Sequence, residues 1–434
     1  MNKKQISVYT LGCKVNQYET EAFSEALEES GYTVVHGGKD SAVCIINTCT
    51  VTSESDRKCR QTIRHAIQDN PDAYVIVTGC FAQISAKSIQ AIHGVDCIIG
   101  NRNKMQVVEM AKAALLGNRE RSIDVPSLQD ADYEKMNVRR SERTRAYIKI
   151  EDGCENNCTY CIIPKARGPI RSRRKEDVLQ EARALVASGY KELVLTGIEV
   201  AAYGKDLADD NLLTLLQKLN ELEGLERIRL SSIELSFLKP QIIEGIAKLD
   251  KVCHHFHLSL QSGCSETLAS MKRKYNTTMI QNTIDHLKTV MPDVLFSADI
   301  IVGFPTETAE HFEKTYALLS KLNLLHMHVF SYSKRPGTPA ADYTCVCTPE
   351  EVKIRSKRLL NLDEESRLNV YTTHAPIGSH HKVLFETSEN GFCTGHTKNF
   401  MEITVQTNEA DLHNQIKTVE IIGYLDKKLL GKLI

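Results

Sequence analysis

The chain has 434 residues, enough for two or three domains, and hydrophobic residues make up 42% of it, enough for packed cores. Its 54 Lys and Arg nearly balance its 55 Asp and Glu, which excludes a protein that holds nucleic acid through a uniformly basic surface. We find no apolar signal segment and no stretch near the ~20 apolar residues of a membrane helix, so we expect a cytoplasmic protein with no membrane partner.

Residues 1–120 predict an α/β domain with a parallel sheet. The runs ISVYTLG, AVCIINT and AYVIVTG are short and almost continuously apolar, which is typical of buried parallel strands. Helical patterns such as NQYETEAFSEALEESG separate them. Cys13, Cys49 and Cys80 each follow one of these strands. Because the carboxyl ends of parallel strands meet at one edge of a sheet, we expect the three thiols to converge there.

Residues 121–143 lack a clear periodicity and predict a connector. Beyond it, residues 144–370 repeat strand and helix, with the strands RAYIKIED, ELVLTG, RIRLSS, HFHLSL, VLFSADIIVGF and LLHMHVFSYS. Six such units at roughly 30–40-residue spacing favour a partial (βα)6 barrel. The chemistry of such barrels lies at the carboxyl edge of the strands.

Residues 371–434 predict a small all-β module. HKVLFET and FCTGHTK flank the pair Asn390–Gly391, which is typical of a tight hairpin turn. FMEITVQT and KTVEIIGYL continue the strand pattern, so we expect a small C-terminal β-barrel. The chain as a whole is predicted to be of the α/β class.

The stretch CENNCTYC places Cys154, Cys158 and Cys161 directly after the first predicted barrel strand. Thiolates are soft ligands that suit iron–sulfur clusters and zinc. A structural zinc site closes with four ligands, and a 4Fe–4S cluster normally takes four cysteines. No fourth Cys or His lies nearby in the sequence, so a cluster here would leave one iron open to a small molecule. Zinc and a plain structural loop stay open as alternatives.

This CxxxCxxC spacing resembles the signature of radical S-adenosylmethionine enzymes. Across the whole chain, the sequence resembles the methylthiotransferases of that superfamily in the segments TLGCKVNQYET, NTCTVT, GCFAQ, CTYCIIPKARGPIRSR, VLTGIEV, HLSLQSG, IIVGFP and YSKRPGTPAA. The C-terminal module resembles their TRAM domain. The first of these segments is most similar to the tRNA enzymes that act on N6-threonylcarbamoyladenosine.

The resemblance implies an enzyme that adds a methylthio group to carbon 2 of N6-threonylcarbamoyladenosine at tRNA position 37, next to the anticodon. The C–H bond at this carbon is neither acidic nor electrophilic, so a cofactor must open it. Related methylthiotransferases that act on isopentenyladenosine in tRNA, or on a ribosomal protein, are the nearest alternatives. An iron–sulfur or zinc-stabilised RNA-binding module without catalysis is an alternative of another class.

Two 4Fe–4S clusters and S-adenosylmethionine are the cofactors that the resemblance implies. One cluster holds S-adenosylmethionine and cleaves it reductively to a 5′-deoxyadenosyl radical, on the ligands Cys154, Cys158 and Cys161. The other carries the transferred sulfur, on the ligands Cys13, Cys49 and Cys80. The implied partners are the tRNA anticodon stem-loop, an electron donor such as a flavodoxin or ferredoxin, and an unknown sulfur donor.

The remaining predicted site residues surround these cysteines. The resemblance places Tyr160 beside the adenine of the cofactor. Residues at the ends of later strands are further candidates for cofactor binding: Gly197, Gln261, Asp299 and Gly303.

The segment 165–175 has six positive charges and no acid, which predicts a track for RNA phosphates beside the cluster, with a solvated helix start as the alternative. Its candidate RNA contacts are Arg167, Arg171, Arg173 and Arg174. The histidine pairs 254–255 and 380–381, and His326 with His328, are expected to serve packing rather than metal binding.

Overall fold

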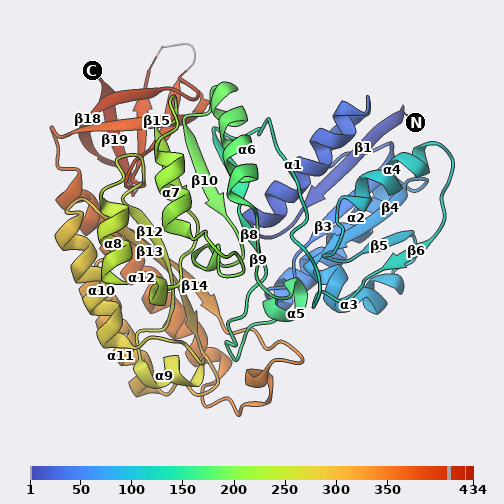
Figure 1. The fold of residues 1–434 in the computed structure, drawn as a ribbon. Helices are drawn as coiled ribbons and strands as arrows, with labels where there is room; N and C mark the ends of the chain where they lie inside the picture. Colours follow the sequence, from blue (N-terminus) through green and yellow to red (C-terminus); the bar gives the residue numbers. More distant parts are fainter. Residues whose placement is uncertain (1, 408–411, 426) are drawn as a thin grey trace.

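The computed structural model describes residues 2–407, 412–425 and 427–434, which form a parallel sheet with its helices, a half-open barrel and a small closed β-barrel (Figure 1). This confirms the predicted α/β class and the all-β C-terminal module. Within the described residues, none of the helices combines the length and the apolar character needed to cross a membrane.

The N-terminal sheet has six parallel strands in the order β2-β1-β3-β4-β5-β6. The strands are β1 (Asn2–Thr10), β2 (Thr33–His36), β3 (Ser41–Thr48), β4 (Tyr74–Gly79), β5 (Cys97–Ile99) and β6 (Ser122–Asp124). The helices packed on them are α1 (Lys14–Glu29), α2 (Ser53–Asp69), α3 (Cys80–Gln90) and α4 (Gln106–Leu115). Every residue of β3 and β4 is buried, as expected for strands covered on both faces. Strand β6 lies in the predicted connector; its three residues pair with β5 without forming an apolar run.

Six parallel strands form the half-open barrel, and all six were predicted. They are β7 (Arg145–Lys149), β10 (Glu192–Thr196), β11 (Arg227–Leu230), β12 (His255–Gln261), β13 (Leu295–Val302) and β14 (His326–Ser331). The sheets β11-β10-β7 and β12-β13-β14 meet through two isolated bridges, Ile228–Val252 and Ile233–Leu258.

Helices and short 3-10 turns alternate with these strands along the chain. They are α6 (Lys175–Ala187), η1 (Val200–Ala202), α7 (Leu212–Asn220), η2 (Leu235–Phe237), α8 (Pro240–Ala247), α9 (Ser265–Ser270), α10 (Thr277–Val290), α11 (Ala309–Leu322), η3 (Pro339–Asp342) and α12 (Pro349–His374). Between β7 and α6 the chain forms a short hairpin of β8 (Glu151–Asp152) and β9 (Arg171–Ser172), with α5 (Ile163–Arg167) in its connection.

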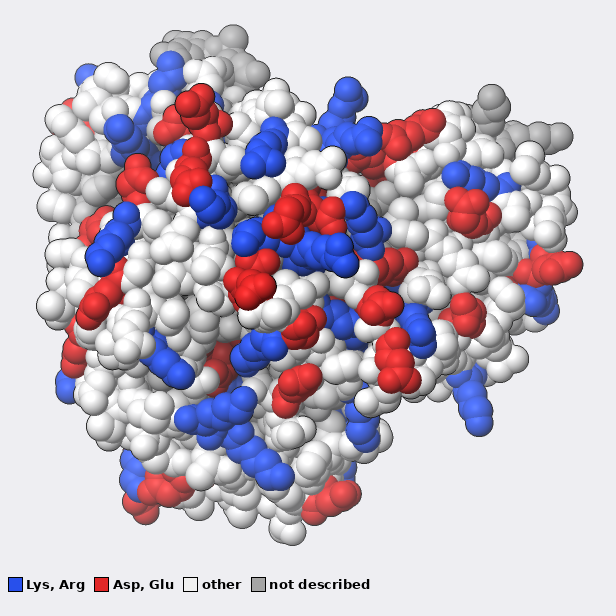
Figure 2. All heavy atoms as spheres, viewed as in Figure 1, with Lys and Arg blue, Asp and Glu red and all other residues white. Residues whose placement is uncertain are grey.

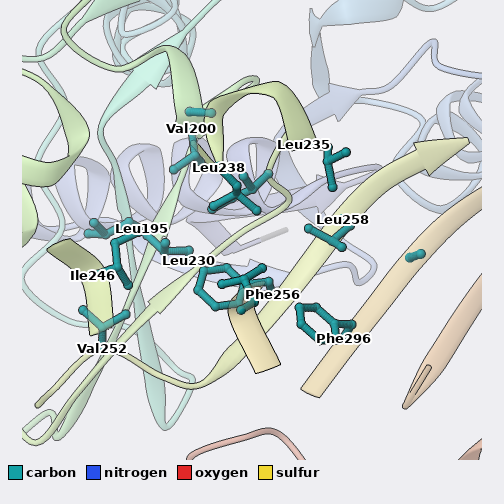
Figure 3. Packing of buried hydrophobic residues seen from close by; sticks show 14 of the residues in the cluster. Leu195, Val200, Leu230, Leu235, Leu238, Ile246, Val252, Phe256, Leu258 and Phe296 are labelled. Atoms are coloured by element: carbon teal, nitrogen blue, oxygen red, sulfur yellow. The ribbon is translucent and has the colours of Figure 1, made fainter. Parts of the chain in front are cut away.

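Alternate side chains of the barrel strands build the largest apolar core. Phe256 and Leu258 of β12 and Phe296 of β13 belong to one buried cluster with residues of the surrounding helices (Figure 3). Because successive strand residues point to opposite faces, the side chains between them point into the barrel. The inner face of the barrel is therefore separate from its apolar packing layer.

The C-terminal module is a closed barrel with strand order β15-β16-β17-β19-β18. Its strands are β15 (His380–Glu389), β16 (Phe392–Thr397), β17 (Glu402–Gln406), β18 (Ile416–Leu425) and β19 (Lys428–Leu433). The predicted hairpin turn at Asn390–Gly391 joins β15 to β16, and both residues have positive φ, at 51° and 77°. The sequence had not indicated β19, which closes the barrel between β17 and β18.

Candidate active site with two cysteine sets

The first cysteine set lies at the carboxyl edge of the N-terminal sheet. Cys13 caps α1 after β1, Cys49 follows β3, and Cys80 begins α3 directly after β4. These three strands are neighbours, in the order β1-β3-β4, so residues far apart in sequence meet at one edge. A Cβ on Gly12 would lie 2.6 Å from the Cβ of Cys49, and Gly12 has a φ of +105°, so the turn into the site requires glycine.

The environment of this set favours a bound, charged form of its thiols. Burial, together with the neighbouring Cys80, raises the pKa of the Cys49 thiol to about 12, so this thiol would stay protonated without a bound metal group. Opposing this, Nε of the fully buried Arg167 donates a hydrogen bond to Sγ of Cys80 at 3.1 Å. A guanidinium donor stabilises a thiolate, which is the form that ligates a metal cluster.

A buried ion network surrounds Arg167. Its Nη1 lies 2.5 Å from Glu19 and 3.0 Å from Asp152, and Lys149 binds the same two carboxylates at 3.0 and 2.6 Å. Lys104 also pairs with Glu19. Arg171 also lies 3.8 Å from Asp152, so four buried cations face two carboxylates, and positive charge is in excess. An anionic cluster on Cys80 and its two partner cysteines would offset a charge that is otherwise costly to bury.

The second cysteine set follows the β8 strand at the mouth of the barrel. The backbone N–H of Asn156 donates to Sγ of Cys154 at 3.4 Å, and Nη1 of Arg273 donates to Sγ of Cys158 at 3.1 Å. Burial raises the pKa of the Cys154 thiol to about 12 and that of the Cys161 thiol to about 11. This set resembles the first because one of its thiols has an arginine donor. Its three thiols are all partly or fully buried, whereas Cys13 of the first set is exposed.

The distances between the three thiols of each set help to distinguish a single zinc ion from a 4Fe–4S cluster. Zinc bonds to sulfur at ~2.3 Å, so three thiolates on one zinc ion lie within roughly 4.6 Å of one another. Among the described residues, the groups of three donors within 4.8 Å of one another include neither cysteine set. A 4Fe–4S cluster holds each cysteine on a different iron and accepts a wider spacing. Both sets therefore fit a three-cysteine 4Fe–4S cluster better than a single zinc ion.

One short helix connects the two sets. Helix α5 begins at Ile163, two residues after Cys161, and ends at Arg167, which bonds Cys80. The side-chain amide of Asn101 also donates to the Ala166 carbonyl at 2.6 Å. The loop that holds the second cysteine set and the N-terminal sheet are thus in direct contact through this helix.

Four of the five predicted cofactor contacts lie in the cysteine loop or at the carboxyl edge of the barrel: Tyr160, Gly197, Gln261 and Gly303. Tyr160 lies edge-on to Phe304, with ring centroids 6.5 Å apart. Gln261 ends β12 with a φ of +65°. A Cβ on Gly197 would collide with the Glu151 carboxylate.

Gly303 and Asp299 each contact side chains that the sequence analysis had not linked to them. Gly303 has a φ of +74°, and a Cβ there would lie 2.5 Å from Val352, so packing alone requires a glycine. Asp299 lies in the middle of β13 rather than at its end, where it accepts from His257 and His328. His326 likewise bonds Asp363, at 3.0 Å, so these histidines do more than fill space.

The predicted phosphate track is wrong for three of its four arginines. Arg167, Arg171 and Arg173 are buried, with exposures of 0%, 6% and 1%. Arg171 donates to the carbonyls of Arg167 and Pro169, and Arg173 pairs with Glu181. Their guanidinium groups are used inside the protein and are not available to RNA.

Arg174 is exposed and has no hydrogen-bond or ion-pair partner within the described ranges. On the face shown in Figure 2, basic and acidic side chains are interspersed and form no single basic field. This agrees with the nearly balanced charge of the chain.

Two residues near the second cysteine set were missed by the sequence reasoning. One is Arg273, the donor to Cys158. The other is Glu199: burial, with the charge of Glu234, raises the pKa of its carboxyl to about 7, and Nδ2 of Asn156 donates to it at 3.2 Å. The sequence signal that could have found Glu199 is its position three residues after the end of β10, at the carboxyl edge of the barrel.

Comparisons with known proteins agree with this geometry. Residues 5–100 match the family described as uncharacterized protein family UPF0004, and residues 148–319 match the radical SAM superfamily. The chain is 39% identical over 427 residues to threonylcarbamoyladenosine tRNA methylthiotransferase MtaB of Bacillus subtilis, covering 96% of this chain and 94% of that protein. It is 38% identical over 385 residues to the Thermotoga maritima protein of the same name, covering 88% and 87%.

Another relative carries a different name. The chain is 33% identical over 443 residues to tRNA-2-methylthio-N(6)-dimethylallyladenosine synthase of Carboxydothermus hydrogenoformans, covering 100% of this chain and 96% of that protein. Among solved structures, the radical S-adenosylmethionine methyltransferase TsrM of Kitasatospora setae matches with a TM-score of 0.58 at 16% identity, over 78% of this chain and 77% of that chain. At this identity the match shows the fold alone.

The coverage and identity of these relatives are high enough to assign the family. Enzymes of this family use S-adenosylmethionine and 4Fe–4S clusters, in keeping with the two cysteine sets. The chain belongs to the methylthiotransferase family of radical S-adenosylmethionine enzymes.

Proposed function

We propose that this enzyme adds a methylthio group to carbon 2 of N6-threonylcarbamoyladenosine at tRNA position 37, next to the anticodon. The observation that carries the proposal is the pair of three-cysteine sets linked by α5 and Arg167. When bound, the two clusters and S-adenosylmethionine supply a 5′-deoxyadenosyl radical at one set and the transferred sulfur at the other. A structural module would need only one closed site, with four ligands.

We propose the following roles for the residues of the chain. Cys154, Cys158 and Cys161 hold the radical-generating cluster, and Cys13, Cys49 and Cys80 hold the sulfur-carrying one. Arg273 and Arg167 stabilise one thiolate in each set. Groups at the carboxyl edge of the barrel hold S-adenosylmethionine: Tyr160, Gly197, Glu199, Gln261 and Gly303. Glu199 suits its ammonium group, because a buried carboxyl with a raised pKa gains most from a cationic partner.

We also propose the division of the chain and its partners. Residues 1–120 carry the sulfur-side cluster, 121–143 connect, 144–370 form the radical barrel, and 371–434 form a TRAM-like module. The partners are the anticodon stem-loop of tRNA in the cytoplasm, an electron donor such as a flavodoxin or ferredoxin, and a sulfur donor. Arg174 is the one predicted RNA contact that the structure leaves exposed.

Isopentenyladenosine in tRNA is the second candidate substrate, because relatives at 33% identity carry the dimethylallyladenosine name. Mass spectrometry of nucleosides from the tRNA of cells with and without this gene separates the two. We expect the methylthio form of threonylcarbamoyladenosine to disappear without the gene, with its unmodified precursor accumulating. Loss of the methylthio form of isopentenyladenosine instead would establish the second candidate.

Replacing Cys49 by Ala should abolish methylthio transfer and spare the reductive cleavage of S-adenosylmethionine. The two cysteine sets lie on different sheets, and no thiol of the barrel set depends on Cys49. The measurements are the methylthio nucleoside and 5′-deoxyadenosine formed by the reconstituted protein. Cys44→Ala on the same strand is the control and should retain both activities, because Cys44 packs in the apolar core. Loss of 5′-deoxyadenosine in a folded Cys49→Ala protein would argue against two separable sites.

A further inference from the structure

Four polar side chains, one of them next to Cys13 in the sequence, are not among the residues proposed to hold either cluster. Oδ1 of Asp299 lies 3.0 Å from Nε2 of His257 and 3.3 Å from Nδ1 of His328, and the two imidazole rings are 4.9 Å apart. Lys14 interacts electrostatically with the same aspartate. We call Lys14, His257, Asp299 and His328 the inner-face cluster.

The three barrel members of the inner-face cluster point away from the apolar core. On β12 the neighbouring Phe256 and Leu258 are buried in that core (Figure 3). Ala298, which precedes Asp299 on β13, belongs to the same core. The alternate side chains, those of His257, Asp299 and His328, stay 15%, 24% and 44% exposed. A hydrogen-bonded set of polar groups that stays open in this way can receive a ligand.

Lys14 carries a charge that its surroundings do not neutralise. It is an exposed residue and the first of α1, directly after Cys13, where the helix dipole disfavours a cation, and no acid lies in that first turn. Within the described residues it has neither a hydrogen bond nor an ion pair. The charges of Arg145 and Arg229 repel its ammonium group, and that of Asp299 attracts it. A bound anion would relieve this unfavourable charge.

The two arginines near Lys14 are already engaged. Nη2 of Arg145 lies 2.9 Å from Glu386, and Nε of Arg229 lies 2.6 Å from Glu192. Both guanidinium groups also lie over the ring of Phe400, at 5.3 and 4.7 Å from its centroid. Of these three cations, Lys14 is the one without an ion-pair partner among the described residues.

The substrates named for the relatives differ in the chemistry that this cluster would meet. A threonylcarbamoyl arm ends in a carboxylate and carries a hydroxyl and amide-type N–H groups, whereas a dimethylallyl arm is a hydrocarbon. Phe330, two residues after His328 on β14, is 46% exposed, and its ring lies 6.4 Å from that of His328. An exposed aromatic ring of this kind is a platform on which an unstacked base can rest. An acidic arm on a nucleoside therefore fits the region, and a hydrocarbon arm does not.

We propose that the inner-face cluster binds the threonylcarbamoyl arm of the substrate, with Lys14 on its carboxylate and His257 and His328 on its other polar atoms. Asp299 holds the two imidazoles in position. The inference rests on the proposed function and names the residue that distinguishes this substrate from an apolar one. Two imidazoles and a carboxylate within 4.8 Å would also suit a divalent cation, but the unpaired ammonium of Lys14 opposes a second positive charge.

The test compares three anticodon stem-loop RNAs of one sequence, bound to the reconstituted protein at one salt concentration. Their position 37 carries threonylcarbamoyladenosine, its carboxyl methyl ester, or isopentenyladenosine. The wild-type protein should bind the acid about 10- to 100-fold more tightly than the ester, the effect of one charged hydrogen bond. Lys14→Met should bind acid and ester equally, and Lys14→Arg should recover most of the preference.

Iron content checks that each variant is folded, and Lys14→Gln replaces Lys14→Met if the latter fails to load its clusters. The inference is wrong if Lys14→Met or Lys14→Gln carries its clusters and still binds the threonylcarbamoyl RNA more tightly than its methyl ester. In that case, methylthio transfer by the wild type to the threonylcarbamoyl RNA would still support the proposed function. A wild-type protein that binds and modifies the isopentenyl RNA instead overturns both. Stoichiometric zinc that is lost in His257→Ala would assign the cluster to a metal and also overturn the inference.

Discussion

Replacing Cys154, Cys158 and Cys161 together by Ala should lower the iron content of the anaerobically reconstituted protein from about eight to about four per chain. The same variant should form no 5′-deoxyadenosine, because no other described cysteine lies in the loop that follows β8. The first set, Cys13, Cys49 and Cys80, should keep its cluster, since its ligands and Arg167 come from the N-terminal sheet and α5. Iron analysis and the visible absorption spectrum measure the first effect, and chromatography of the cofactor products measures the second.

The matched control replaces two cysteines outside both sets. Cys345 and Cys347 lie in the partly exposed loop before α12 and should be replaceable by Ala with no loss of iron. A triple variant that retained about eight irons would show that these three cysteines do not hold a cluster. Loss of all iron in a folded triple variant would show that the two clusters assemble as one unit.

The placement of the cysteines could be predicted from the sequence because it follows from local patterns. A near-continuous apolar run marks a buried parallel strand, and the residue after the run must lie at the carboxyl edge. Cys13, Cys49 and Cys80 satisfy this rule independently, and strand pairing in the order β1-β3-β4 then brings them together. The same rule located Gly197 at the barrel mouth.

The burial of Arg167 and Arg173 could not be predicted, because the acids that they pair with lie outside the segment 165–175. Arg167 meets Glu19, which lies 148 residues away, and Arg173 meets Glu181 on α6. A dense positive run is typical of a solvated or RNA-binding surface, and nothing within the run indicates that its partners are buried acids on other elements. Lys14 and Asp299 were not recognised as neighbours for the same reason, since α1 and β13 come together only in the folded chain.

Replacing Glu19 by Gln should strongly destabilise the N-terminal part of the molecule. Glu19 is fully buried and binds Arg167, Lys149 and Lys104. Burial alone would raise the pKa of Glu19, but these three cations hold it well below its usual range. Without the carboxylate, Lys104 would lose its ion-pair partner, and Arg167 and Lys149 would keep only Asp152. Breaking a buried pair in this way costs about 3–5 kcal/mol.

We expect the midpoint of thermal unfolding to fall by roughly 6–12 °C near pH 7. Circular dichroism of the reconstituted protein measures this midpoint. The folded pKa of Glu19 lies below the unfolded one, so its contribution is complete above about pH 4.5 and falls as the pH drops toward the folded value. The gap between wild type and variant should therefore narrow in acid. Glu28→Gln, an exposed position on the same helix α1, removes the same charge and should leave the midpoint within about 1 °C. Equal midpoints for the Glu19 and Glu28 variants would mean that the buried network contributes no net stability, and Arg167 would then be placed on Cys80 by packing alone.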